Sequence, residues 1–197
     1  MKIIKNNSDS RHKKILFLHG TKTGYDSKWM ELIVDLLSMK PYEIIRPQFP
    51  EIYKTNSENN DQTLSLVDSI ATLIDEMNLG EDLIIMGKSL GAKVAVELAK
   101  SIPAEKLVLL GYPFTFRSGK IRVERVNNIN KLDLPVCIIQ GERDKYGSRP
   151  IVENIELKDQ ASIHWIPNVD HNYYLEGETQ VTESDMDKLQ DYLCSIL

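Results

Sequence analysis

Six short runs of aliphatic and β-branched residues recur along the chain and predict the strands of one sheet. Most of them are apolar at consecutive positions, which is typical of strands buried on both faces in a parallel sheet covered by helices. The predicted strands are Lys14–Leu18, Glu43–Arg46, Leu83–Met86, Lys106–Leu110, Pro135–Ile139 and Ser162–Ile166.

Three segments between these strands carry apolar residues at helical spacing, and a fourth follows the last strand. The first three are Trp29–Met39, Leu64–Met77 and Leu90–Ala99. The fourth begins at Thr182, which stands three positions before Asp185 as in a capping box. The alternation predicts a three-layer α/β/α domain over residues 1–197, doubly wound, with about six mostly parallel strands.

Composition narrows the class of protein. Of the 197 residues 42% are hydrophobic, enough for one sizeable core, and the formal net charge of −5 argues against a general nucleic-acid binder. No apolar run is long enough to span a bilayer, and residues 1–8 turn polar too early for a signal peptide, so a cytoplasmic protein is expected. Cys137 and Cys194 are interpreted as structural, and the polar stretch Tyr53–Asp61 as a surface loop.

The segment around Ser89 carries the strongest chemical signal. An apolar strand ends in Gly87-Lys88-Ser89-Leu90-Gly91, and a helical pattern follows at once. This is the pattern of a nucleophile elbow, in which the residues two before and two after the serine must be nearly free of side chain. The alternative is an ordinary serine capping a helix.

Two more chemical groups follow predicted strands. Asp144 comes after the fifth strand and His171 after the sixth, and in such sheets catalytic groups lie beyond the carboxyl ends of the strands. A serine hydroxyl needs a neutral imidazole to take its proton, and an acid to orient that imidazole. Ser89, His171 and Asp144 are therefore the predicted catalytic residues, with Asp170 as a rival partner for the imidazole.

The first strand is followed by Leu18-His19-Gly20-Thr21. Backbone N–H donors stabilise the negative charge that builds on the substrate oxygen during acyl transfer. The predicted oxyanion hole uses the N–H groups of Thr21 and Leu90, the latter at the positive end of a helix. His19 is expected to be structural.

These residues resemble the α/β-hydrolase superfamily over almost the whole chain. The resemblance rests on His19-Gly20, the Ser89 elbow, the segment Gln140–Asp144 and Asp170-His171. With Gly111–Phe114 after the fourth strand, the chain looks most like the small, lidless, single-domain members near the dienelactone-hydrolase-like group. The resemblance implies a Ser-Asp-His hydrolase.

Three departures refine what the resemblance implies. The first predicted strand begins so early that the two leading strands of larger members have no room, which implies six strands. Dienelactone hydrolases use a cysteine nucleophile where this chain has Ser89, so their substrate is not carried over. About twenty-five residues separate the fourth and fifth strands, too few for a helical cap, so the site is expected to be open.

Several basic residues are expected near the mouth of the site. They are Lys22, Lys88, Arg143 and Arg117. Lys22 and Lys88, together with Tyr112, are the predicted substrate-binding residues, and the hypothesis follows that the substrate carries a carboxylate or phosphate. The alternative is that these are solvated surface residues.

The sequence predicts a serine hydrolase that cleaves a small ester or thioester through an acyl-enzyme, although an amidase or peptidase would use the same parts. No metal is expected, because no two histidines show metal-ligand spacing with a carboxylate or cysteine. No cofactor is expected either, since Asp82 stands where a phosphate-binding loop ending at Lys88-Ser89 needs its first glycine. The expected partner is a small-molecule substrate, with no nucleic acid and no membrane span, and the oligomeric state is left open. Residues Pro47–Asp61 and Tyr112–Val123 are expected to set specificity. The alternative function is a non-catalytic scaffold that binds other proteins.

Overall fold

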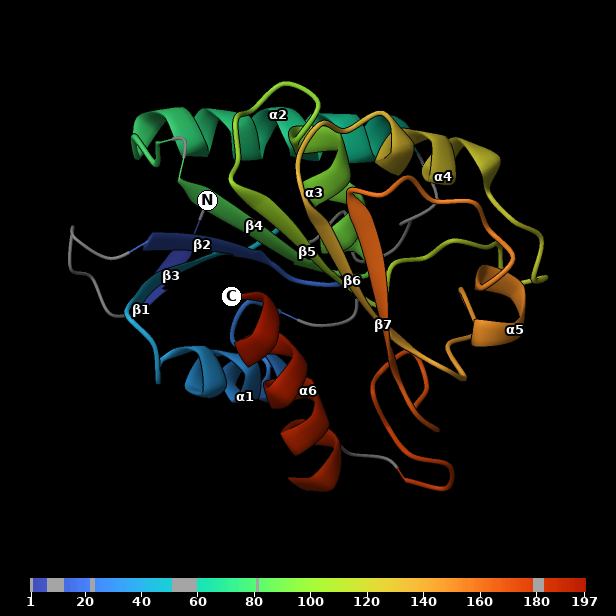
Figure 1. Ribbon diagram of the computed structural model, residues 1–197. Helices are drawn as coiled ribbons and strands as arrows, with labels where there is room; N and C mark the ends of the chain where they lie inside the picture. The colour runs from blue at the N-terminus through green and yellow to red at the C-terminus, as the bar shows by residue number, and fades with distance from the viewer. Residues whose placement is uncertain (1, 7–12, 22–23, 51–59, 81, 179–182) are drawn as a thin grey trace.

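The structure is a computed structural model that describes residues 2–6, 13–21, 24–50, 60–80, 82–178 and 183–197 (Figure 1). Seven strands form one sheet in the order β1-β3-β2-β4-β5-β6-β7, in which only β1 is antiparallel to its neighbour. The strands are β1 (Ile3–Asn6), β2 (Lys13–Leu18), β3 (Tyr42–Pro47), β4 (Leu83–Lys88), β5 (Lys106–Leu110), β6 (Val136–Gly141) and β7 (Ala161–Ile166).

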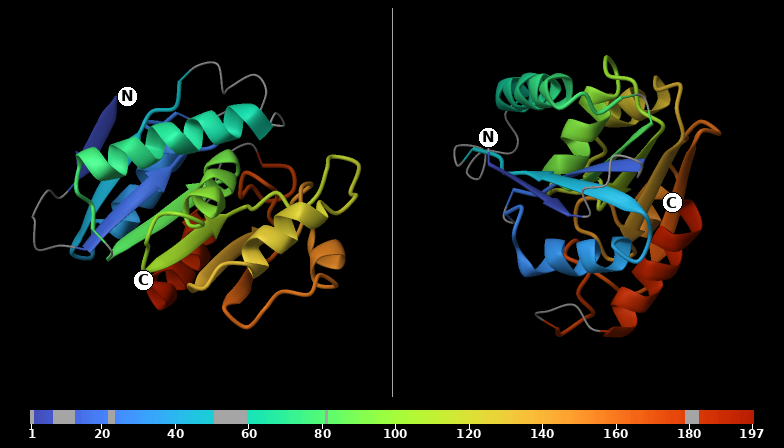
Figure 2. Two further views of the ribbon diagram at one scale, coloured as in Figure 1. Left: turned by 90° about the horizontal axis from the view of Figure 1, so that it is seen from above. Right: turned by 90° about the vertical axis from the view of Figure 1, so that its left-hand side faces the viewer.

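Helices cover both faces of the sheet. Three of them pack on one face and two on the other, and a short helix lies beside the end of β7 (Figures 1 and 2). The helices of the first face are α2 (Asn60–Glu76), α3 (Leu90–Leu98) and α4 (Val123–Asn130). Those of the second face are α1 (Lys28–Leu37) and α6 (Glu183–Ile196), and the short helix is α5 (Arg149–Val152).

All six predicted strands and all four predicted helices are confirmed, and so is the α/β/α architecture. The expectation of six strands is wrong by one, because the chain before β2 forms β1 against the outer edge of β3. The polar stretch was expected to be a loop as far as Asp61, but α2 already begins at Asn60; residues 51–59 lie outside the described part.

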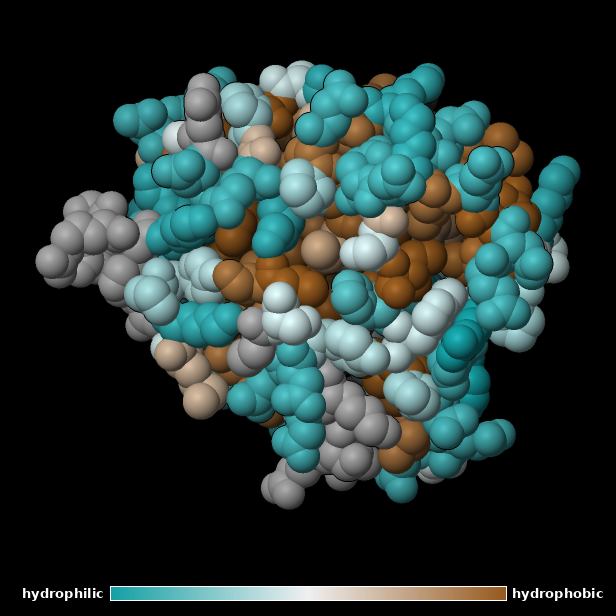
Figure 3. Space-filling view, in the orientation of Figure 1, coloured by the Kyte–Doolittle hydropathy of each residue, from teal (hydrophilic) through white to brown (hydrophobic). Residues whose placement is uncertain are grey.

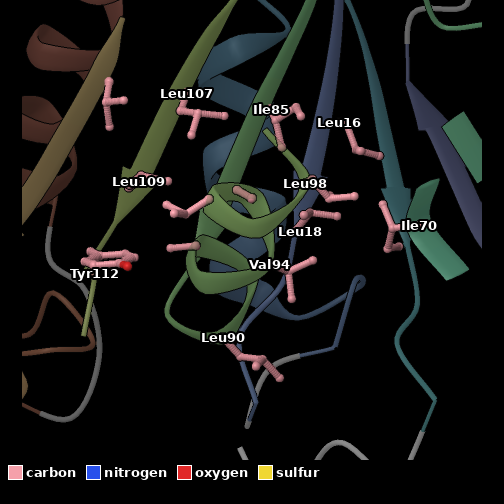
Figure 4. Packing of buried hydrophobic residues seen from close by; sticks show 14 of the residues in the cluster. Leu16, Leu18, Ile70, Ile85, Leu90, Val94, Leu98, Leu107, Leu109 and Tyr112 are labelled. Atoms are coloured by element: carbon pink, nitrogen blue, oxygen red, sulfur yellow. The ribbon is translucent and has the colours of Figure 1, made fainter. Parts of the chain in front are cut away.

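The core on the α2–α3–α4 face fixes α3 against the strands that carry the site. Val94 and Leu98 of α3 are fully buried, and they pack over Leu18, Ile85 and neighbouring strand residues (Figure 4). Burying one such side chain stabilises the fold by about 1.5–3 kcal/mol. The first turn of α3 therefore has a fixed position at the carboxyl end of β4.

The outer surface is mixed in character. Figure 3 shows hydrophilic side chains over most of one face, with hydrophobic side chains visible near its centre. Among the described residues, no helix is both long and apolar enough to cross a membrane.

Candidate active site

Ser89 sits in a sharp turn between β4 and α3. Its backbone has φ 54° and ψ −104°, a conformation that residues with a side chain rarely adopt. Its N–H donates to the carbonyl of Leu110 (3.0 Å). Its carbonyl accepts from the N–H of Lys93 (3.1 Å), and this is the first hydrogen bond of the α3 helix. A strained residue of this kind costs about 1–3 kcal/mol and persists only where its surroundings hold it.

Two glycines make the turn possible. A Cβ on Gly91 would overlap the backbone carbonyl of Leu18 in β2, and a Cβ on Gly87 would overlap the backbone of Gly91. The strand and the helix therefore pass each other in backbone contact. This confirms the prediction that both positions flanking the serine exclude a side chain.

The structure brings Ser89, His171 and Asp144 together at the carboxyl ends of β4, β7 and β6. The His171 Nε2 lies 3.0 Å from Ser89 Oγ, and the His171 Nδ1 lies 2.7 Å from Asp144 Oδ2. A carboxylate accepts hydrogen bonds, so Nδ1 carries the proton and Nε2 is left to accept from the serine hydroxyl. This continuous chain of hydrogen bonds is the arrangement that activates a serine.

Asp144 is fully buried and held from two sides. Its Oδ1 accepts from the Tyr146 N–H (2.8 Å), and its Oδ2 accepts from Gln140 Nε2 (2.9 Å) as well as from His171. Sequence reasoning did not assign a role to Gln140 or Tyr146, although an amide in an otherwise apolar strand was a signal for Gln140.

Asp170, the rival partner, does a different task. Its Oδ1 accepts from the N–H groups of Asn172 (2.7 Å) and Tyr174 (3.0 Å). It thus closes the turn that carries His171, which a β-bridge between Val169 and Leu175 also pins.

His171 is held in its neutral form. Burial lowers the pKa of the imidazole, the nearby ammonium of Lys88 lowers it further, and the hydrogen bond and charge of Asp144 act in the opposite direction. Because the pKa lies below its ordinary value of about 6.5, Nε2 is free to accept a proton at neutral pH.

The loop after β2 reaches the elbow from the other side. The pairing of Leu18 with Gly87 starts this loop beside β4, and a Cβ on Gly91 would come within 2.8 Å of the carbonyl of His19. The His19 ring is buried against Phe49 and accepts from the Phe49 N–H at Nε2 (2.9 Å), so its position agrees with a structural role. Thr21 follows two residues later.

Two of the three predicted substrate-binding residues are buried instead of exposed at the mouth of the site. Lys88 is buried, and its ammonium donates to the backbone carbonyl of His171, so its predicted place at the mouth is wrong. Tyr112 is also buried, packs edge-on against Phe114, and directs its hydroxyl to the Arg125 carbonyl (3.4 Å), so it belongs to the core (Figure 4). Both follow or end a central strand, where packing decides the direction of the side chain. Lys22 lies outside the described residues.

Arg143 and Arg117 are both exposed, which fits a place near the mouth and equally the alternative of solvated surface residues. The Arg143 guanidinium donates to the Asn168 carbonyl (3.1 Å) and approaches Glu176 (3.8 Å), so part of its charge is already matched. In the described part of the chain, no group of His, Cys, Asp and Glu side chains is arranged to hold a metal ion.

A hollow of about 460 Å³ lies far from these residues. Its lining comes from the turn after α3 and the turn before β6, at the amino ends of β5 and β6, whereas Ser89 follows the carboxyl end of β4. None of the three candidate catalytic residues lines this hollow.

Comparisons with known proteins agree with this geometry. The model of a family described as an alpha/beta hydrolase domain matches residues 11–194. The structure is similar to an alpha-beta serine hydrolase homologue from Coxiella burnetii, with a TM-score of 0.72 and 14% identity over 99% of this chain and 90% of that one. An esterase from Exiguobacterium antarcticum gives a TM-score of 0.72 and 13% identity over 98% and 93%.

A serine hydrolase described as lacking a lid, from Xanthomonas campestris, gives a TM-score of 0.70 and 15% identity over 98% of this chain and 86% of that one. At these identities the similarity is one of fold. No curated protein gives a significant sequence match.

Proposed function

The chain belongs to the alpha/beta hydrolase family and is a hydrolase, and from that premise we propose that it cleaves a small ester or thioester through an acyl-enzyme on Ser89. The observation that carries the proposal is the unbroken chain of hydrogen bonds from Ser89 through His171 to the buried Asp144. We further propose that the protein acts in the cytoplasm.

The reaction proceeds in two halves. As Ser89 Oγ attacks the carbonyl carbon, the His171 Nε2 takes the hydroxyl proton, and Asp144 stabilises the imidazolium that forms. The imidazolium then gives this proton to the leaving alcohol or thiol as the acyl–oxygen or acyl–sulfur bond breaks. A water molecule then enters and attacks the acyl carbon while His171 takes its proton. As the bond from this carbon to Ser89 Oγ breaks and the acid is released, the imidazolium returns the proton to Oγ and restores the hydroxyl.

The oxyanion is bound by two backbone donors. Leu90 is the first residue of α3, so its N–H has no acceptor within the helix, and the helix dipole favours a negative charge there. The second donor is the N–H of Thr21, on the loop that passes beside the first turn of α3. Each such donor is worth about 3 kcal/mol in the transition state.

Substrate selection rests on loops at the carboxyl ends of the strands. The connection from β5 to β6 holds the short helix α4, turns and a β-bridge between Thr115 and Ile121, which supports an open site without a helical cap. The corrected position of Lys88 leaves Lys22, Arg143 and Arg117 as the residues on which the hypothesis of an anionic substrate depends.

The first prediction concerns the reactivity of Ser89. A fluorophosphonate probe, which phosphonylates activated serines, is expected to label the wild-type protein once, while Ser89→Ala and His171→Ala lose the label. Intact-mass spectrometry measures the adduct. Ser101→Ala, at an exposed turn position, is the matched control and keeps the label.

Persistent labelling of Ser89→Ala would move the nucleophile to another residue. A folded wild type that takes no label would instead favour the alternative of a non-catalytic scaffold. A series of short-chain p-nitrophenyl esters, matched acyl thioesters and anilides then separates an esterase or thioesterase from an amidase.

A further inference from the structure

Lys88 is a buried cation directly before the nucleophile. It is 5% exposed, and its Nζ lies 4.6 Å from the centre of the Tyr173 ring and 5.7 Å from that of the Trp29 ring. The two rings stack on each other at 5.8 Å. Faces of aromatic rings attract a cation, so α1 and the loop that carries His171 together form a cage for the ammonium.

The ammonium is bound to the backbone of the catalytic histidine. Nζ donates to the carbonyl of His171. Two residues further along the same loop, the Tyr173 hydroxyl donates to the Ile139 carbonyl (2.7 Å), and Tyr173 itself has a positive φ of 65°. The loop is thus tied to β4 through Lys88 and to β6 through Tyr173.

Gly111 gives this ammonium access to the Asp144–His171 pair. Its φ is +58°, and a Cβ at this position would lie 2.6 Å from Lys88 Nζ and 3.4 Å from both Asp144 Oδ2 and His171 Nδ1. All three groups therefore border one small space that the missing side chain leaves open. Lys88 and Asp144 are both buried, and buried charges that border one space act on each other more strongly than charges in water.

We propose that Lys88 is a positioning residue for His171: its ammonium fixes the backbone of the histidine loop and opposes the protonation of the imidazole in the resting enzyme. The proposal rests on the function proposed above for its meaning in catalysis. The charge effect on His171 exists whether or not the protein hydrolyses an ester.

The charged and titratable groups around Lys88 and His171 determine the protonation states of both residues. Burial lowers the pKa of Lys88 to about 8, against the opposing charges of Asp144 and Asp170. Lys145 adds a weaker positive charge beside His171, and the Tyr146 ring meets the imidazole edge-on at 4.8 Å. Lys88 therefore remains largely protonated at pH 7, where its charge acts on His171.

A methionine of similar length would fill this space without the cost of burying a charge. Lys88→Met is therefore the variant that removes the charge while keeping most of the volume. Lys88→Gln removes the charge and retains an N–H donor. The matched control is Lys93→Met, which removes another buried ammonium, one that contacts Thr63 Oγ1 (3.2 Å).

The second prediction is the pKa of His171 in these variants. It is measured by NMR titration of the imidazole C–H signals, with the His171 signal identified by its absence in His171→Gln. We expect the pKa to rise by about one unit in Lys88→Met and in Lys88→Gln, and to stay at the wild-type value in Lys93→Met. The acid limb of kcat/KM for p-nitrophenyl acetate should move to higher pH by the same amount.

The two roles of Lys88 separate at a pH that lies above the pKa of His171 in every variant and below about 8, where Lys88 of the wild type is still mostly charged. There Lys88→Met should lose about tenfold in kcat, and Lys88→Gln should recover part of it through the retained donor. An unchanged pKa of His171 in a folded variant overturns the charge role, because a merely structural lysine would lower activity without moving the titration.

The wild type supplies an independent measurement if both variants fail to fold. An imidazole that titrates at or above its ordinary value would contradict the proposal. Failure of the proposed function looks different: the wild type would then neither hydrolyse esters nor take a fluorophosphonate, while the titration of His171 would still respond to Lys88.

Discussion

At the residue scale, the contact between Gly91 and β2 is the tightest constraint on the elbow. A methyl group there meets the carbonyl of Leu18, which is rigid backbone and cannot turn away. The strain at Ser89 is held in place by this contact, because α3 can approach β2 only while position 91 lacks a side chain.

The third prediction follows. Gly91→Ala should lower the free energy of unfolding by about 3 kcal/mol, because backbone must shift to admit the methyl group. Gly80→Ala is the control: its φ of +80° is also unfavourable for alanine, but nothing lies within 4 Å of the added carbon. It should cost roughly 1 kcal/mol. Urea denaturation compares the two, and equal losses would contradict the argument from close contact.

The fourth prediction concerns stability and pH. Burial and Lys88 lower the pKa of His171 in the folded state, so below about pH 6.5 the unfolded chain binds this proton and the folded protein does not. The free energy of unfolding should therefore decrease as the pH is lowered below about 6.5, by up to about 1.4 kcal/mol per pH unit from this group alone, until the pKa of the folded state is reached.

Urea midpoints between pH 7 and pH 5 measure this slope, and His171→Gln should show a smaller one. Other histidines contribute equally to both proteins, so the difference isolates His171. Identical slopes would mean that the imidazole titrates normally in the folded state.

The sequence was sufficient to locate the residues whose positions depend on the backbone. Ser89, Asp144 and His171 follow strand ends, and strand ends can be located from hydrophobic runs. Lys88 and Tyr112 were misplaced because their long side chains turn according to packing: the cage of Trp29 and Tyr173 forms only in three dimensions. Local patterns carry no signal for such a contact.

At the scale of elements, the helices and strands that were missed share one property: they do not bury a regular apolar face. β1 is a partly buried edge strand with two isoleucines between lysines. α4 buries Arg125 beside Val126 and Ile129, so its inner face is partly charged. α5 has four residues and leaves no periodicity to detect.

The fifth prediction tests the helix that closes the second face. Leu193 of α6 is 2% exposed and lines the seam between α6 and α1. Leu193→Ala should cost about 2–5 kcal/mol of unfolding free energy through lost burial and the cavity that remains. Ser195→Ala, exposed on the same helix, should change it by less than about 0.5 kcal/mol. Thermal or urea unfolding measures both changes in the free energy of unfolding. A small decrease in Leu193→Ala would mean that α6 packs loosely.

At the scale of the whole molecule, the order of the strands assembles the site. The strands β4, β5, β6 and β7 are consecutive neighbours in the sheet. The groups that follow them therefore meet at the carboxyl ends of the strands, although they are scattered along the chain. The short strand β1 lies at the other lateral end of the sheet, beside β3, and contributes no residue to the candidate site. A small number of strands therefore suffices for the candidate catalytic residues.

The hydrogen bond between the side chains of His171 and Ser89 joins positions that lie 82 residues apart in the chain. Closing so long a loop is slow and entropically costly until β5, β6 and β7 have paired in sequence. A partly folded chain can contain a complete elbow and still hold an unactivated serine. During refolding, fluorophosphonate reactivity would thus return with the final docking of β7, later than the secondary structure, and would report the arrival of the native state.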